Sequence, residues 1–430
     1  MSRQNVSRAR TGWRRTAARV LPALLVASWV SSVARAQQSY TWQELRDKFI
    51  AANPTLQAAK LAVEESKAEE ITAYLRPNPD MTAALDQLDP FSWNPYRPLG
   101  YTFPLLSFSY LHERQGKREL RRDSARQATL IADFSASDQQ RGLLFNLRAA
   151  FVQTLQAKSV LLVTRENLAY WDKVLTISSD RLRAGDIAQI DLDRLELERV
   201  QFESDVQTAE VNLRTAKIQL LQLLNDRTPI EQFDVTGRFD FAEQTMPLEE
   251  FRTIALDNRP DLKAALQASE KAVVDHKLAV ANGTTDPTFG MDVGRNPPIP
   301  AYFGVSVNIP LRIFDKNQGE KLRTEIDIRR NQRLGEAARA QVFSDVDSAY
   351  VMVNSNVILL KPYKAKYLQQ AVRVRDTVAF AYQRGGATLL DFLSAENDYR
   401  SVQLNYLNLV GAYLTAAGQL NLAVGREVIQ

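Results

Sequence analysis

The sequence predicts a mainly α-helical protein with four short membrane β-strands, built from two similar halves. Glycine and proline number only 17 each in 430 residues, which favours long helices over an all-β fold. The second half of the chain repeats the order of motifs in the first at an offset of about 200 residues. Each half also contains two short segments in which apolar residues alternate with small or polar ones, as in β-strands.

The N-terminus has the pattern of an export signal. Residues 1–36 contain seven arginines and no acidic residue, with an apolar run over 20–33 and Ala34-Arg35-Ala36 after it. This pattern is typical of a secretory signal cleaved after Ala36, and the run is too short to span a membrane as a helix. Removing the signal leaves 47 Lys and Arg (54 minus 7) against 50 Asp and Glu. The basic excess therefore lies in the signal, and we expect no nucleic-acid partner.

The residues needed for most catalytic and metal sites are scarce. The chain has no cysteine, which excludes disulfides, thiolate ligands and an N-terminal lipid anchor. His112 and His276 are too far apart in the sequence to favour a zinc enzyme or a catalytic triad. No HExxH, GxSxG, phosphate-binding loop or dinucleotide fingerprint is present. We therefore expect no enzyme, no cofactor and no resident metal.

The duplication sets the predicted order of elements in each half: a helix, two strands, a very long helix, a tight turn and a final helix. Trp42-Gln43-Glu44-Leu45 matches Leu248-Glu249-Glu250-Phe251, and Arg183-Ala184-Gly185 matches Arg384-Gly385-Gly386 at an offset of 201. The first repeat, 37–230, has strands within about 79–109, a long helix over about 110–182, a turn at about 183–190 and a helix over about 191–225. The second repeat, 231–430, begins with an equatorial segment and a helix, followed by strands within about 286–311, a long helix over about 316–383, a turn at about 384–390 and a helix over about 391–425.

The last helix of each repeat carries an apolar seam with alternating spacings of three and four, the pattern of left-handed coiled-coil packing. The seam residues are Leu192, Leu195, Arg199, Phe202, Val206, Ala209, Leu213, Ala216, Leu220 and Leu223, and, 200 residues later, Phe392, Ala395, Tyr399, Val402, Tyr406, Leu409, Tyr413, Ala416, Leu420 and Ala423. Apolar residues off the seam, such as Leu197 and Val211, predict contacts on more than one side. The long helices would each reach roughly 100 Å, which implies a rod or tube, and Pro362 should kink the second.

The alternating segments fit strands of a membrane barrel with a wet lumen. In 303–309, Phe303, Val305, Val307 and Ile309 alternate with Gly304, Ser306 and Asn308, while the loop at 89–96 adds aromatic residues suited to a membrane interface. Two amphipathic hairpins on a soluble sheet remain the alternative. Four strands are too few to close a membrane barrel, and open edges are unfavourable in lipid, so several copies must share one barrel.

Over nearly the whole mature chain, these features resemble outer-membrane efflux proteins of the TolC type. Two repeated motifs carry the resemblance: Arg183-Ala184-Gly185-Asp186-Ile187 before Asp191-Leu192, and Tyr382-Gln383-Arg384-Gly385-Gly386 before Asp391-Phe392. The resemblance implies a homotrimer with twelve strands in one bacterial outer-membrane barrel, surrounded by lipid. It also implies a periplasmic tube of twelve helices that docks to an adaptor (membrane fusion) protein and an inner-membrane pump of the RND or ABC type.

The resemblance also assigns roles at the tips. Asp391 and, as its first-half counterpart, Asp191 would lie at the periplasmic entrance, and Tyr382 matches a tyrosine that holds the entrance closed. Ser394 stands where family members have a second acid, and Ala387 replaces an arginine of the closing contact. Arg183, Gly185, Arg384 and Gly386 lie in the turns that would meet the adaptor. From the residues alone, Asp191 and Asp391 are equally well explained as favourable charges at helix N-termini.

The predicted function is therefore a passive exit duct for metal ions or drugs. A duct for type I secretion of proteins or peptides and an exported coiled-coil scaffold without a pore are the alternatives. The segments Leu75-Arg76-Pro77-Asn78-Pro79 and Gln115-Gly116-Lys117-Arg118 resemble members associated with heavy-metal efflux.

Overall fold

Long helices dominate the part of the chain that the computed structural model describes, which is residues 38–88, 90–91, 95–96, 98–99, 102–243, 246–296 and 299–429. The proposed signal at 1–36 and part of the aromatic loop at 89–96 lie outside these residues. Residues Gln37–Gln430 form one unit, described below. Among the described residues, no helix is both long enough and apolar enough to cross a membrane.

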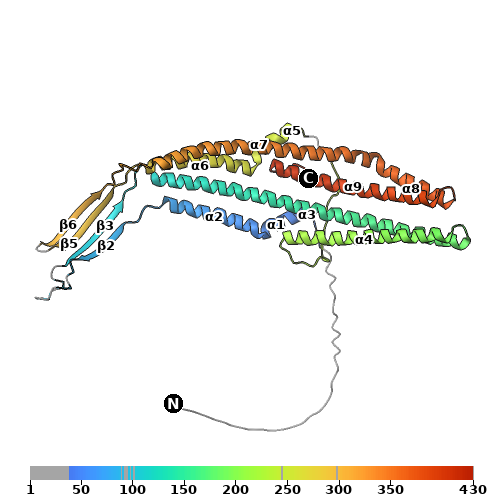
Figure 1. Ribbon diagram of the computed structural model, residues 1–430, viewed down its shortest axis with the longest axis horizontal. Coiled ribbons are helices and arrows are strands. Elements are labelled where there is room, and N and C mark those ends of the chain that lie inside the picture. The colour runs from blue at the N-terminus through green and yellow to red at the C-terminus, as the bar shows by residue number, and fades with distance from the viewer. Residues whose placement is uncertain are drawn as a thin grey trace, which may run out of the picture. The chain divides into compact units, whose positions relative to one another are not determined.

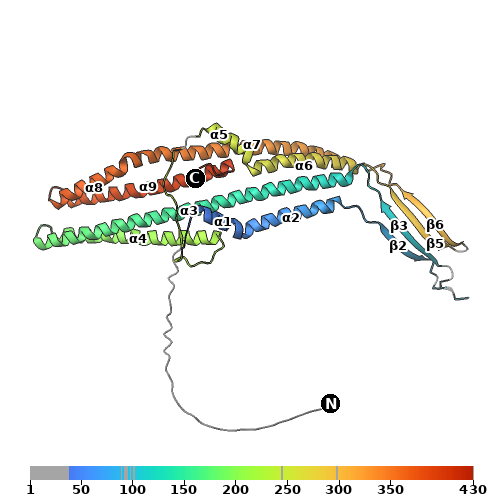
Figure 2. The same cartoon turned by 180° about the vertical axis from the view of Figure 1, so that it is seen from behind.

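Four rows of helices lie side by side in the helical region (Figures 1 and 2). The first row contains α2 (Pro54–Tyr74) and α4 (Gln189–Leu223), and the second is α3 (Lys117–Ala184), which packs along both of them. The third row contains α6 (Pro260–Asn282) and α9 (Leu389–Val424), and the fourth contains α7 (Gln318–Pro362) and α8 (Leu368–Gln383). Two short helices, α1 (Trp42–Ala52) and α5 (Leu248–Asn258), precede α2 and α6. The two repeats thus meet along the contact of α3 with α6 and α9.

Local sequence explains where α1 and α2 begin. Thr41 and Glu44 form a capping box, in which each side chain bonds to the other residue's backbone N–H. Asn53 then interrupts the helix, because Pro54 has no N–H to donate and its ring disfavours helical backbone in the preceding residue. The Asn53 side chain accepts the N–H of Leu56 at 3.1 Å, which starts α2 in a new direction.

One boundary of the long helices differs from that expected, and the interruption expected at Pro362 is confirmed. The first helix begins at Lys117 and not near Tyr110, because Tyr110 and Leu111 still pair with Phe289 and Thr288 in the sheet. The second is not one continuous α-helix, since a π-helical segment, Tyr363–Tyr367, separates α7 from α8. This segment directly follows Pro362, which cannot supply the backbone donor that a regular helix requires.

One antiparallel sheet contains four strands in the order β2 (Asp80–Asp86), β3 (Phe103–Leu111), β5 (Thr288–Asn296) and β6 (Ile299–Asn308). Strand register places mostly apolar residues on one face and mostly small or polar residues on the other, where the large exceptions include Phe103, Leu105 and Tyr302. Two adjacent rows on the first face are Met81, Phe108, Met291, Val305 and Ala83, Leu106, Val293, Phe303. The row on the opposite face between them is Thr82, Ser107, Asp292, Gly304. The predicted alternation is therefore confirmed in three dimensions, and the apolar face is exposed, with Val305 at 77%.

A second, two-stranded sheet was not predicted. The strand β1 (Gln38–Tyr40) pairs in parallel with β4 (Phe233–Val235), far away in the sequence. Phe233 and Val235 are fully buried against α1 and α3. Three-residue strands give little periodicity, so the sequence alone does not reveal them.

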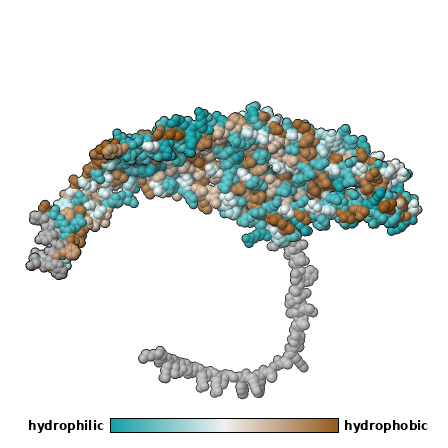
Figure 3. Space-filling view, viewed as in Figure 1, coloured by the Kyte–Doolittle hydropathy of each residue, from teal (hydrophilic) through white to brown (hydrophobic). Residues whose placement is uncertain are grey.

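The coiled-coil seam is confirmed at most of its positions. The buried members are Leu192, Leu195, Phe202, Val206, Ala209, Ala216 and Leu220 in α4, and Phe392, Ala395, Tyr413, Ala416, Leu420 and Ala423 in α9. Residues of α4 off the seam are exposed in the single chain, with Leu197 at 73% and Val211 at 58%. Figure 3 accordingly shows hydrophobic residues scattered among hydrophilic ones over the helices.

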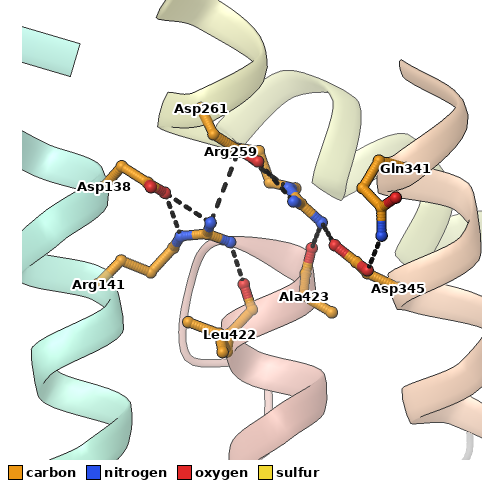
Figure 4. Close-up of polar contacts among 8 residues, drawn as sticks. All are labelled: Asp138, Arg141, Arg259, Asp261, Gln341, Asp345, Leu422 and Ala423. Carbon is orange, nitrogen blue, oxygen red and sulfur yellow. Dashed lines mark hydrogen bonds and ion pairs between the residues drawn. The ribbon is translucent and has the colours of Figure 1, made fainter. Parts of the chain in front are cut away.

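A buried arginine joins the end of α9 to the start of α6 at the waist, where these two helices meet end to end (Figure 4). Arg259 is 3% exposed and bonds to Asp345 of α7 at 2.7 Å, to Asp261 of α6 at 2.5 Å and to the carbonyl of Ala423 at 3.3 Å. Arg141 of α3 donates to the neighbouring Leu422 carbonyl at 2.5 Å. Both arginines thus donate to backbone carbonyls that lack an i+4 helical partner at the C-terminal end of α9, where the helix dipole also favours positive charge.

Candidate functional site at the hairpin tips

The two helix hairpins, α3 with α4 and α8 with α9, end on the same side of the helical region (Figures 1 and 2). Each turn is closed by the same pair of backbone hydrogen bonds. In the first turn Gly185 donates to Leu182 and Asp186 to Arg181, at 3.0 and 2.9 Å. In the second, Gly385 donates to Tyr382 and Gly386 to Ala381, at 3.1 and 2.8 Å. These are Schellman motifs with glycine in the left-handed conformation.

The geometry corrects the register between the two tip motifs. Gly185 has φ of 82° and Gly385 has φ of 75°, so the structural counterpart of Gly185 is Gly385 and not Gly386. The offset is therefore 200 at the turns, as in the following helices, and the apparent match of Arg183 with Arg384 is displaced by one residue. Sequence comparison chose the wrong glycine because two are adjacent in the second turn.

Asp391 forms a capping box with the N-cap residue Thr388 at the N-terminus of α9. Its carboxylate accepts the N–H of Thr388 at 3.0 Å and the Thr388 hydroxyl at 2.6 Å, while the Thr388 hydroxyl accepts the N–H of Asp391 at 3.1 Å. The hydroxyl and N–H of Thr388 hold the pKa of Asp391 below its usual range. The capping interpretation is thus confirmed for Asp391, whose exposed carboxylate stays ionised at neutral pH.

Asp191 is in a different environment. It lies in the first turn of α4, but the N-cap residue three positions before it is Ala188, which offers no side-chain acceptor. Asp191 lies close enough to Tyr382 for its charge to disfavour ionisation of that phenol. The two aspartates therefore differ in local structure, although both stand at the tips.

Tyr382 belongs to a stack of aromatic rings that crosses all four helices near the tips. Phe202 of α4 stacks on Trp171 of α3 at 4.8 Å between ring centroids, Trp171 on Phe392 of α9 at 5.9 Å, and Phe392 on Tyr382 of α8 at 5.1 Å. The Trp171 ring donates to the Leu195 carbonyl at 3.0 Å, which fixes its orientation. We call these four residues the tip ladder. Aromatic pairs of this kind add stability beyond that of the buried area.

The Tyr382 hydroxyl is buried without a hydrogen-bond partner among the described residues. Burial raises the pKa of this phenol, and the nearby Arg181 opposes the shift. Arg181 lies over the Tyr382 ring at 5.3 Å. In the single chain, therefore, the Tyr382 side chain contacts its neighbours through its ring, and its hydroxyl forms no hydrogen bond with the described residues.

The arginines of the turns are available to a partner in the single chain. Arg183 is largely exposed and its guanidinium pairs with the exposed Asp180 at 2.9 Å, a contact of small energetic value. Arg384 lies over the Phe380 ring at 5.1 Å. Neither is held by a buried acid.

A buried carboxyl above the tip ladder was missed by the sequence analysis. Glu396 of α9 is 5% exposed, and its Oε1 atom has no hydrogen-bond partner among the described residues. Burial raises its pKa to about 7, against the opposing influence of Arg375 and Tyr170. Asp376, on α8, adds to the rise. A lone glutamate in a helix carries no sequence signal, because its neighbours come from α3 and α8.

The described residues contain no group of three or more His, Asp or Glu side chains arranged to hold a metal ion. His276 instead pairs through Nδ1 with the Thr324 hydroxyl at 2.9 Å.

No protein family model matches the chain. In sequence, it is similar to the cobalt-zinc-cadmium resistance protein CzcC of Cupriavidus metallidurans, with 24% identity over 329 residues, or 73% of this chain and 75% of that protein. In structure, it matches CusC, a protein that forms a transmembrane channel, with a TM-score of 0.75 and 17% identity over 91% of this chain and 94% of CusC. It also matches the open MtrE outer-membrane channel of Neisseria gonorrhoeae, with a TM-score of 0.74 and 17% identity over 93% and 94% of the two chains.

The chain therefore has the fold of the TolC-type outer-membrane channels. The resemblance carried by its two tip motifs is confirmed, and so is its similarity to a protein of heavy-metal resistance.

The corrected register predicts different effects of two adjacent substitutions. Gly385→Ala should destabilise the α8–α9 hairpin by roughly 1–2 kcal/mol, because alanine is strained at positive φ. Gly386→Ala should cost less than about 0.5 kcal/mol, since its φ is ordinary and the added methyl would make only normal contact with Ala381. Thermal unfolding of the helical circular-dichroism signal measures both. Equal effects of the two substitutions would refute the register.

Glu396 predicts a specific pH dependence of stability. Its folded-state pKa, about 7, lies above the usual value of 4.5, so the folded protein holds this proton more tightly and stability falls as pH rises from about 4.5 to 7. Glu396→Gln should remove this loss and be more stable than wild type at pH 8 by about 1 to 3 kcal/mol. Thermal unfolding at pH 4.5 and at pH 8 measures the difference. Asp398→Asn, at an exposed position of the same helix, is the control. A Glu396→Gln protein that loses stability with pH as wild type does would contradict the assignment.

Proposed function

We propose that this chain is one subunit of an outer-membrane exit duct, which passively conducts small substrates delivered by a periplasmic adaptor and an inner-membrane pump. The observation that carries the proposal is the four-stranded sheet, with one apolar face and two unpaired edges, attached to long helices. The similarity to outer-membrane channels supports it.

The sheet supports a shared barrel. Its edge strands, β2 and β6, have no further partner among the described strands. Each unpaired backbone donor or acceptor would cost several kcal/mol in lipid. The apolar face suits lipid and the opposite face, with Thr82, Ser107 and Asp292, suits water. Three copies would supply twelve strands and pair each β6 with the β2 of the next copy.

The helical region supports the same closure. Its outer rows are α2 with α4 and α7 with α8, so these rows have a free side in the single chain. On α4, exposed apolar residues recur at heptad spacing, interrupted once by Ser204: Ile190, Leu197, Val211 and Ile218. Exposed apolar residues also line α7, namely Val351, Met352, Ile358 and Leu359. A stripe of this kind on each outer row fits a ring in which α4 of one copy meets α7 and α8 of the next.

The tips support an entrance function. Asp391 is ionised and exposed, and in a trimer three copies of Asp391 and of Asp191 would surround the opening with negative charge. We propose Arg183, Gly185, Arg384 and Gly386 as parts of the surface that meets the adaptor. The similarity to a cobalt-zinc-cadmium resistance protein supports metal cations as the cargo over secreted peptides.

Conductance tests the duct directly. The purified protein, reconstituted in a planar bilayer, should open ion-conducting channels, and it should migrate as a trimer in detergent. Absence of conductance from protein that is correctly inserted and trimeric would overturn the proposal and leave an exported scaffold.

Charge and capping at Asp391 can be separated with two variants. Asp391→Asn removes the charge but keeps an oxygen that can accept from Thr388, so cation-over-anion selectivity should fall, on the order of twofold. Thr388→Ala removes the capping box but keeps the carboxylate, so selectivity should persist despite lower stability. Reversal potentials in a salt gradient measure this. If Asp391→Asn leaves them unchanged, Asp391 does not line the conduction path.

A further inference from the structure

A pocket of about 400 Å³ opens at the waist between the two repeats. Its walls come from α1, from α3 and from the end of α9 with the residues that follow it. The described residues that line it include none from α4 or α7, the helices proposed to meet the next copy. A volume of this size is within the range of small-molecule sites.

Arg148 of α3 lines this pocket, and among the described residues its guanidinium has an ion pair with Glu427 but no hydrogen-bond acceptor. Its side chain is 19% exposed, and the nearest carboxylate is Glu427 at 3.8 Å, too far for a hydrogen bond. The guanidinium lies over the Trp42 ring at 4.7 Å. Burial lowers its pKa, an effect that Glu427 only partly offsets. A guanidinium offers five donors, so this partly buried group has donors to spare for a ligand in the pocket.

Two neighbouring arginines at the waist, unlike Arg148, have hydrogen-bond acceptors for their guanidinium groups. Arg141 bonds to Asp138 and to the Leu422 carbonyl, each at 2.5 Å, and Arg259 bonds to two carboxylates and a carbonyl (Figure 4). Arg426, in contrast, is an exposed residue that lines the pocket with neither an ion pair nor a hydrogen bond among the described residues. Two of the arginines that line the pocket are therefore available to an anion from outside the chain.

The rest of the wall restricts the class of anion. Trp42, Leu144, Phe145, Pro260 and Leu422 present apolar surface, and Ser137, Gln140 and Asn421 add neutral polar groups. A strongly hydrated inorganic anion would leave the apolar wall unfilled. A molecule with an apolar body and one carboxylate would satisfy both parts of the pocket.

We propose that this pocket, called the waist pocket below, is a binding site for a small amphipathic carboxylate. Arg148 and Arg426 would hold the carboxylate, and Trp42, Leu144 and Phe145 would pack against the apolar body. Such a ligand would connect α1 and α3 of the first repeat to the end of α9 in the second. The site is independent of the proposed duct, because it needs neither conduction nor an adaptor.

Calorimetric titration of the full-length mature protein in a non-ionic detergent tests the site, with octanoate as the probe and octanol as its uncharged match. Octanoate should bind saturably and octanol at least about tenfold more weakly. Arg148→Met, which keeps an apolar stem, and Arg426→Met should each weaken octanoate binding by about tenfold. Arg333→Met is the control, since Arg333 is an exposed residue of α7 paired with Glu336, and its binding should equal wild type.

Arg426 is exposed, so Arg426→Met keeps the test decisive if Arg148→Met fails to fold. Absence of saturable octanoate binding to wild type would overturn the proposal. Equal binding of octanol and octanoate, or unchanged binding to the folded arginine variants, would also overturn it, because the charge would then not be recognised.

Discussion

Backbone hydrogen bonding at the two sheet edges is the constraint on which the rest of the arrangement depends. The strands β2 and β6 each have one side without a partner among the described strands, and neither lies next to the other. In water such edges promote aggregation, and in lipid the free-energy cost of their unpaired backbone groups is prohibitive. Copies of the chain can satisfy them by pairing with one another. The outer helical rows then need to meet as well, and their exposed apolar stripes provide matching surfaces.

The duplication explains how such long helical rows are built from shorter helices. At the waist, α4 ends where α2 begins and α9 ends where α6 begins, and a side chain joins each pair. Asn53 donates to the Leu223 carbonyl at 3.5 Å in the first joint, and Arg259 donates to the Ala423 carbonyl at 3.3 Å in the second. The second joint also holds Asp345 and Asp261, and it lies beside the waist pocket. The two repeats have therefore kept one architecture while their joints have diverged in charge.

The structural features that depend on local periodicity could be predicted from the sequence. The apolar faces of the strands, the helical seams and the break after Pro362 all follow from residues close together in the chain. What depends on neighbours from distant helices was not predicted: the tip ladder around Trp171, the buried carboxyl of Glu396 and the buried Arg259. The wrong glycine at the second tip has a different cause, since only the φ angle separates Gly385 from Gly386.

Disulfide trapping between the sheet edges tests the shared barrel most directly, and the absence of native cysteine makes the background clean. Thr82→Cys on β2 would be combined in turn with cysteine at Gly304, Ser306 and Asn308 of β6. Within one chain, two strands separate these edges, so about 14 Å lies between them and no internal disulfide can form. Cysteines at Thr82 and Ser107, which are register partners, provide the intrachain control. A shared barrel of three copies should give a covalent ladder ending at three subunits for at least one pair, whereas a panel that stays monomeric while the control pair oxidises would contradict it.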